Sequence, residues 1–266
     1  MRRAVALATL TLATVPFTVA AQWQGYPTPR IPRTADGKVN LSAPAPKTAD
    51  GQPDLNGIWL ASRAVFDLRQ AVKDIPLSPE GKAIFDQRQA TQSKDDPSGR
   101  CLLVGVPRIT SMPLPIKIIQ TKDEVTFLYE TFHAFRVIPT DGRKHPDDLD
   151  PSFMGDSVGH WEGDTLVVDV VGFNDKTWLG AGGASLHSDA LHVVERYQRV
   201  DYDTITYNVF IEDPKVFTKT WNTAPSFLSL RPGERLREYE CIADNQDIQR
   251  FEELLKNPAL FVRPQQ

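Results

Sequence analysis

The sequence has no long apolar run beyond its N-terminal segment and no block of basic residues. After residue 21, no stretch reaches the roughly 18 apolar residues that a membrane-spanning helix needs. The formal net charge is -4, from 30 basic and 34 acidic side chains. A mildly acidic chain is a poor partner for nucleic acid or for an anionic membrane surface. We therefore expect a small-molecule ligand, and the oligomeric state stays open.

Residues 1–21 differ from the rest of the chain, because they have the pattern of a secretory signal peptide. Arg2 and Arg3 precede an apolar run over residues 4–17, and Val19-Ala20-Ala21 is a small-residue cleavage site. The pattern is typical of export, and the run is too short for a membrane anchor. We expect a cleaved protein that resides in the periplasm or is secreted.

Cysteine is scarce, since only Cys101 and Cys241 occur. In an exported protein an even pair predicts a disulfide, and two free buried thiols are the alternative. The bond would close a loop of about 140 residues, worth on the order of 4–5 kcal/mol through the lost chain entropy of the unfolded state. It would tie the start of the folded region to its end.

Motifs for nucleophilic, phosphate-binding and metal sites are also missing. The sequence has no G-x-S-x-G, no H-E-x-x-H, no Cys-rich zinc spacing, and no glycine-rich loop after a buried parallel strand. We therefore expect no cofactor and no metal, although a metal site assembled from separate strands would leave no local motif. Isomerisation or elimination fits this sequence better than hydrolysis.

The chain divides into three parts. Residues 1–21 are the expected signal peptide, and residues 22–54 are rich in proline, threonine, alanine and glycine with almost no apolar periodicity. Such a composition predicts an extended arm. A single barrel domain is expected over residues 55–266.

Short apolar runs separated by turn signals predict that this domain is mainly β. Consecutive strands without intervening helices indicate an antiparallel meander that closes into a lipocalin-like barrel, with a two-sheet sandwich as the alternative. Two short peripheral helices are expected, one capped by Ser78 before Pro79 and one after Asp247. The expected strands span residues 55–59, 116–121, 124–130, 133–138, 158–161, 165–171, 191–200, 204–212, 217–221 and 236–241.

Histidines are few but concentrated, since all five lie between residues 133 and 192 together with many aspartates. This concentration indicates acid–base chemistry, whereas a set of polar loops on a solvent face is the alternative. Asp169 interrupts the apolar strand 165–171, where an unpaired carboxylate is costly. We expect His133, Asp169 and His192 to be the catalytic residues.

Strand alternation suggests which side chains face a common barrel lumen. The expected lining consists of Tyr129, His133, Asp169 and either His192 or Glu195. Ion pairs that only hold strands together, such as Glu195 with Arg136 or Arg196, are the alternative. The residues expected to bind the substrate are Tyr129, Asn174, Trp178, Glu195 and Trp221.

Several longer motifs carry a resemblance that covers essentially the whole mature chain. They are P-D-L-N-G-I-W at 53–59, D-G-R-K-H-P at 141–146, G-D-S-V-G-H-W-E-G-D-T-L-V-V-D at 155–169, and H-S-D-A-L-H-V-V-E-R-Y at 187–197. The chain resembles a family of exported bacterial proteins that share these motifs, which implies export and no particular chemistry. The G-x-W of Gly57 and Trp59 is similar to that of lipocalin-like (calycin) barrels.

These observations lead to one main hypothesis about function. The protein is expected to be an exported enzyme, of isomerase or lyase type, that does cofactor-independent acid–base chemistry on a small, partly apolar molecule held in a barrel. A non-catalytic periplasmic binding protein for a small apolar or glycosidic ligand is the alternative. A third possibility is an envelope module whose proline-rich arm docks a partner.

Overall fold

The computed structural model describes residues 32–38, 40, 43–61, 75–180, 186–241, 252–253 and 256–257. The expected signal peptide, the first part of the expected arm, and most of the expected helix after Asp247 lie outside the described residues. None of the described helices has the length and apolar character needed to cross a membrane.

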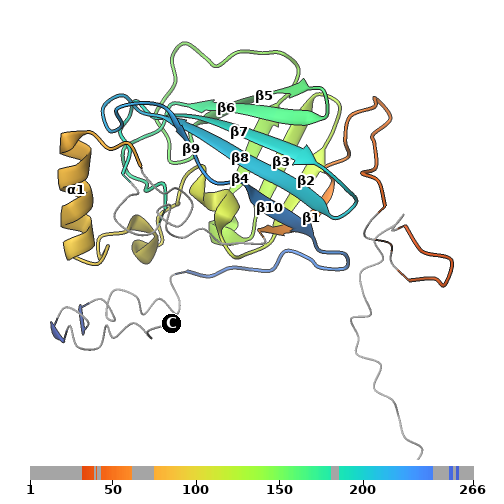
Figure 1. Ribbon diagram of the computed structural model, residues 1–266, viewed down its shortest axis with the longest axis horizontal. Helices are drawn as coiled ribbons and strands as arrows, with labels where there is room; N and C mark the ends of the chain where they lie inside the picture. The colour runs from red at the N-terminus through yellow and green to blue at the C-terminus, as the bar shows by residue number, and fades with distance from the viewer. Residues whose placement is uncertain are drawn as a thin grey trace, which may run out of the picture.

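The described chain is mainly β, as the alternating apolar pattern predicts. Its strands are β1 (Gly57–Ala61), β2 (Ile116–Gln120), β3 (Glu124–Tyr129), β4 (Phe135–Pro139), β5 (Asp156–Glu162), β6 (Thr165–Val171), β7 (His192–Arg199), β8 (Thr204–Glu212), β9 (Trp221–Asn222) and β10 (Ser226–Leu230). All pairs are antiparallel, in the order β4-β3-β2-β1-β10-β8-β7-β6-β5, with β9 beside β8. The sheet curls into a nearly closed barrel (Figure 1), so the predicted meander barrel is confirmed.

The barrel closes where the first and last strands of this order meet. A Cβ atom added to Gly159 on β5 would lie 2.9 Å from the Cγ2 atom of Ile138 on β4. Only a residue without a side chain lets these strands approach so closely. The Arg136 guanidinium on β4 also donates a hydrogen bond of 3.0 Å to the hydroxyl of Ser157 on β5. Side chains therefore join these strands, which share no backbone ladder in the described residues.

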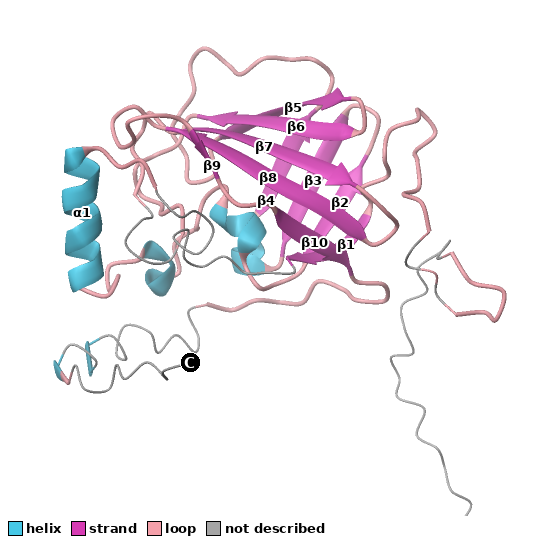
Figure 2. Ribbon diagram, in the orientation of Figure 1, coloured by secondary structure: helices cyan, strands magenta, loops and turns pink. Residues whose placement is uncertain are grey.

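Helix α1 (Pro79–Ala90) begins where its capping signal predicts. The Ser78 hydroxyl accepts a hydrogen bond of 3.0 Å from the backbone N–H of Gly81, and Pro79 occupies the first turn. The helix stands beside one end of the barrel (Figure 2). Three single-turn 3₁₀ helices follow along the chain: η2 (Pro97–Arg100), η3 (Arg108–Ser111) and η4 (Thr131–His133).

Three predicted strands differ from the structure: 133–138 is present with a later start, 217–221 shares only Trp221 with β9, and 236–241 is absent. The run predicted to begin at His133 begins at Phe135, because Phe132 and His133 have φ values of 56° and 51°, which no strand accommodates. The predicted strand 236–241 is not a strand. The backbone N–H of Tyr239 is bound by the His133 ring at 2.7 Å rather than by a neighbouring strand. The segment that pairs between β1 and β8 is β10.

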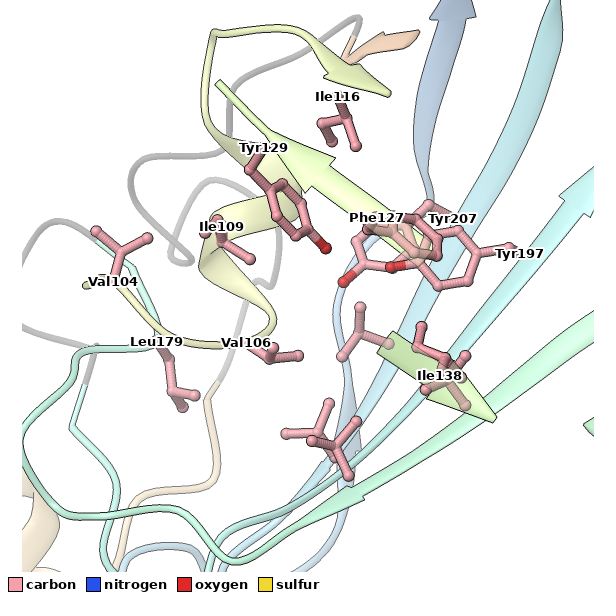
Figure 3. Close-up of a cluster of buried hydrophobic side chains, with 14 of the residues drawn as sticks. Val104, Val106, Ile109, Ile116, Phe127, Tyr129, Ile138, Leu179, Tyr197 and Tyr207 are labelled. Atoms are coloured by element: carbon pink, nitrogen blue, oxygen red, sulfur yellow. The ribbon is translucent and has the colours of Figure 1, made fainter. Parts of the chain in front are cut away.

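Alternate residues of each strand fill the barrel with a packed core. Figure 3 shows part of it, where Phe127, Tyr197 and Tyr207 lie together and Ile138 packs nearby. Trp59 is fully buried, and its indole N–H donates to the Leu55 carbonyl at 2.9 Å. Each large apolar side chain buried in this way contributes about 1.5–3 kcal/mol.

The predicted disulfide is confirmed, since Cys101 and Cys241 are bonded with Cα atoms 5.7 Å apart and 140 positions apart in sequence. It connects the end of η2 with the segment that follows β10. The folded domain is therefore closed covalently across nearly all of its strands.

Candidate functional site

Carboxylates and imidazoles alternate in a row on the outer face of the wall formed by β5–β8, the strands that lie side by side in Figure 1. The row consists of Asp156, His145, Asp169, His192 and Glu212, and we call it the imidazole–carboxylate row. The His145 Nδ1 atom lies 2.5 Å from Asp156 Oδ1, and its Nε2 atom lies 2.9 Å from Asp169 Oδ1. The His192 Nε2 atom lies 2.7 Å from Asp169 Oδ2, and its Nδ1 atom lies 3.5 Å from Glu212 Oε2.

Strand register places four members of this row. Asp156 lies on β5 and Asp169 on β6, while His192 on β7 pairs directly with Glu212 on β8. The neighbours Val168 and Val170 point into the core and are fully buried, so alternation turns Asp169 outward. His145 comes from the connection between β4 and β5 and completes the row.

The row is partly exposed and electrostatically coupled. The side chains of Asp169 and His192 are each 35% exposed. The hydrogen bond from His192, helped by that from His145, lowers the pKa of Asp169 against the effect of burial. The hydrogen bond to Asp169 raises the pKa of His192 in turn, with Glu212 adding to the effect. His192 therefore keeps its proton to a higher pH than a free imidazole does, and Asp169 stays ionised.

These shifts predict how the row contributes to stability. The lowered pKa of Asp169 gives a contribution that is present above its unfolded value near pH 4 and is lost in acid. The raised pKa of His192 gives a contribution that is complete below about pH 6.5 and is lost as pH rises through its folded value. Urea denaturation should therefore show the largest stability difference between wild type and His192→Gln at about pH 5, and a smaller one at about pH 9. A difference that stays constant with pH would contradict the coupling.

The nitrogen and oxygen atoms of the row face each other in pairs rather than a common centre. Across the described ranges, no group of three or more histidine, cysteine, aspartate or glutamate side chains is arranged to hold a metal ion. The arrangement is instead suited to moving protons, because each imidazole has a carboxylate to orient it.

A second polar group lies inside the barrel. Glu195 is fully buried, and its Oε2 atom accepts a hydrogen bond of 2.6 Å from the Arg136 guanidinium. Its Oε1 atom accepts from the hydroxyls of Tyr197 at 2.8 Å and Tyr207 at 2.6 Å. Burial raises the pKa of both tyrosines, so they are neutral donors. The ion pair of Glu195 with Arg136, considered above as an alternative, is therefore present.

Tyr129 belongs to the same interior group but is held weakly. Its hydroxyl lies 3.5 Å from Thr110 Oγ1 and 3.5 Å from Arg136 Nη1. Burial also raises its pKa. In the part of the chain that the structure describes, the buried Nε of Arg136 and the buried hydroxyl of Ser226 have no hydrogen-bond partner.

The expected common lumen is therefore wrong. Tyr129 and Glu195 point into the barrel, whereas Asp169 and His192 lie on the outer face of β6 and β7. The sheet therefore separates the two pairs of side chains. His133 lies in η4 and is exposed, so it joins neither group. The reason is that β6 is apolar on both faces, and its sequence therefore does not show which face turns inward.

The remaining expected substrate-binding residues lie apart from both groups. The Asn174 side chain accepts a hydrogen bond of 3.1 Å from the backbone of Lys176 and so shapes a turn. Trp178 is buried beneath the Arg88 guanidinium, which lies 4.1 Å from the ring centroid. Trp221 is buried edge-on against Phe217. Their roles in binding stay predictions.

Sequence reasoning missed His145, Asp156 and Glu212 as partners of Asp169 and His192. His145 lies in no predicted strand, and its contacts reach across 11 and 24 positions of the chain. The available signal was the D-G-R-K-H-P motif, which places a histidine next to a proline in the connection before β5.

Comparisons with known proteins add no further assignment. No protein-family model, curated protein or solved structure matches the chain. The resemblance to an exported bacterial family therefore stays an expectation from the sequence motifs, and a functional assignment rests on the geometry of the site.

Proposed function

We propose that the protein is an enzyme that moves protons on a small, partly apolar molecule without an organic cofactor. The imidazole–carboxylate row is its site, with His192 as the acid–base residue and Asp169 as its orienting carboxylate. The observation that supports this most is the 2.7 Å hydrogen bond between these two residues, both of which remain accessible to solvent. A histidine held by a carboxylate is a recurrent acid–base arrangement in enzymes.

The hydrogen bonds define which nitrogen meets the substrate. His192 Nε2–H donates to Asp169, so the Nδ1 atom, 3.5 Å from Glu212 Oε2, is the nitrogen left for the substrate. In the neutral ring Nδ1 has a lone pair that takes a proton from a substrate C–H bond, and Asp169 stabilises the resulting imidazolium. The electron pair left on carbon forms a new double bond. Return of the proton to another atom completes an isomerisation, and departure of a leaving group completes an elimination.

The surroundings of the row fit a partly apolar substrate. Val158 and Val194 flank Asp169 on the neighbouring strands, and Phe210 on β8 pairs with Val194 and is 37% exposed. This apolar surface lies on the outer face, beside the row. The proposal therefore moves the substrate from the barrel interior, which the core fills, to this outer face.

The disulfide supports a location outside the cytoplasm. Disulfides persist in oxidising compartments, and the Cys101–Cys241 bond joins distant parts of the fold. We therefore propose that the protein is exported, as its N-terminal sequence pattern indicates.

Deuterium incorporation tests the reaction across a range of candidate substrates. Wild-type protein in D₂O is incubated with a panel of small carbonyl compounds that have an acidic C–H bond, and their mass is followed. We expect exchange or conversion of at least one compound, and a loss of about a hundredfold or more in His192→Gln. The matched variant His160→Gln, which removes an exposed imidazole paired with Glu162, should keep wild-type activity. Equal activity in His192→Gln and wild type would refute the assignment.

Ligand carriage is a second candidate, favoured by the same apolar surface beside the row, which includes Phe210 at 37% exposed. Such a surface can hold a partly apolar molecule without any proton transfer. A carrier would bind members of the same panel and release them with no deuterium gained. The exchange assay therefore separates the two candidates.

A further inference from the structure

His145 has both of its ring nitrogens engaged by carboxylates. Its Nδ1 atom lies 2.5 Å from Asp156 on β5, and its Nε2 atom lies 2.9 Å from Asp169 on β6. Its side chain is 20% exposed, compared with 35% for His192. The ring is therefore enclosed between two strands, and neither nitrogen is open to a substrate.

The two hydrogen bonds require an additional proton in this part of the row. An ionised carboxylate only accepts hydrogen bonds, and a neutral imidazole donates only one. The lowered pKa of Asp169 keeps that carboxylate ionised. Both hydrogen bonds are satisfied with ionised carboxylates when each ring nitrogen of His145 carries a proton, which places a positive charge next to Asp169.

His145 also determines how Asp169 meets His192. One carboxylate oxygen, Oδ1, accepts from His145, and the other, Oδ2, accepts from His192. With Oδ1 engaged, the carboxylate cannot rotate about its terminal bond without losing both hydrogen bonds. The orientation of the His192 ring thus depends on a residue that does not touch it.

We infer that His145 is a positioning residue of this site, which fixes the Asp169 carboxylate and places a positive charge that modulates the protonation of His192. Its catalytic consequence rests on the proposed function, whereas its effect on His192 does not. The charged groups in contact with His145 are Asp156 from β5 and Asp169 from β6. Asp169 contacts His192 from β7, and His192 lies beside Glu212 from β8.

An NMR titration of His192 tests this inference without any substrate. His145→Gln keeps a side chain that can donate to Asp169 but removes the positive charge. We therefore expect the midpoint of the His192 titration to rise by roughly half a pH unit, as removal of a nearby like charge predicts. His160→Gln on the same sheet face is the matched control and should leave the midpoint unchanged. A folded His145→Gln protein with the wild-type midpoint would overturn the inference.

A measurement on the wild-type protein covers the case in which His145→Gln does not fold. Nitrogen-edited spectra at neutral pH should show His145 with a proton in both of its ring-nitrogen hydrogen bonds. A ring with one nitrogen free of any proton would contradict the positioning role.

A kinetic measurement tests the catalytic part of the inference separately from the titration. For a substrate found by deuterium exchange, His145→Gln should lower kcat about tenfold with little change in KM, because the base is misplaced while the binding surface is intact. A wild-type protein without any turnover refutes the proposed function and leaves the titration result standing. An unchanged kcat in His145→Gln with a shifted titration refutes the catalytic part alone.

Discussion

Replacing Asp169 with asparagine is expected to lower turnover about a thousandfold while the barrel stays folded. The carboxylate accepts hydrogen bonds from His145 and His192 through its two oxygens. An amide has one oxygen and one NH₂ group, so it can accept from only one of them and would present N–H groups to the other. His192 then loses its orienting partner, and the imidazolium formed during proton transfer loses its counter-charge.

The test of this prediction needs a matched aspartate. Asp164→Asn makes the same chemical change in the turn between β5 and β6, where Asp164 forms an exposed ion pair with Lys47. Steady-state kcat should fall in Asp169→Asn and remain at the wild-type value in Asp164→Asn. Urea denaturation of both variants shows whether the fold is retained. A folded Asp169→Asn protein with wild-type turnover would remove Asp169 from the mechanism.

Replacing Arg136 with methionine is expected to destabilise the protein by about 3–5 kcal/mol. The Arg136 and Glu195 side chains are 2% and 0% exposed, and their atoms are 2.6 Å apart. Methionine fills much of the same volume but leaves a buried carboxylate without its positive partner. The two tyrosine hydroxyls that also bind Glu195 cannot neutralise its charge.

Urea denaturation of a mutant cycle checks this prediction. The double variant Arg136→Met/Glu195→Gln should be more stable than Arg136→Met alone, because it no longer buries an unpaired charge. Arg196→Met is the control, since Arg196 forms its ion pair with Glu162 on the outer face and should contribute little. If Arg136→Met and Arg196→Met are equally stable, the interior ion pair does not hold the barrel together.

Much of the fold follows from local signals in the sequence. The start of α1 at Ser78-Pro79 and the turns between adjacent strands depend on chemistry within a few residues. The disulfide follows from the presence of only two cysteines. The meander order also follows, because consecutive strands joined by short turns pair with each other. None of these features depends on how the whole sheet curves.

Local signals in the sequence did not predict which segment forms the last strand or how the residues of the site are arranged. The sequence predicts residues 236–241 as the last strand, whereas tertiary pairing with β1 and β8 shows that the last strand is β10. Similarly, the sequence shows that His145 is one of five histidines. It does not show that this loop residue packs against the outer face of β6.

By itself, the sequence determined that Asp169 is a costly carboxylate in an apolar strand and that histidines gather around it in the chain. Only the tertiary structure decided that Asp169 faces outward to His145 and His192, while Glu195 faces inward to Arg136. The physical reason is the two-residue period of a β-strand, which sorts side chains onto two faces but does not say which face curls inward. That choice depends on the curvature and closure of the whole sheet.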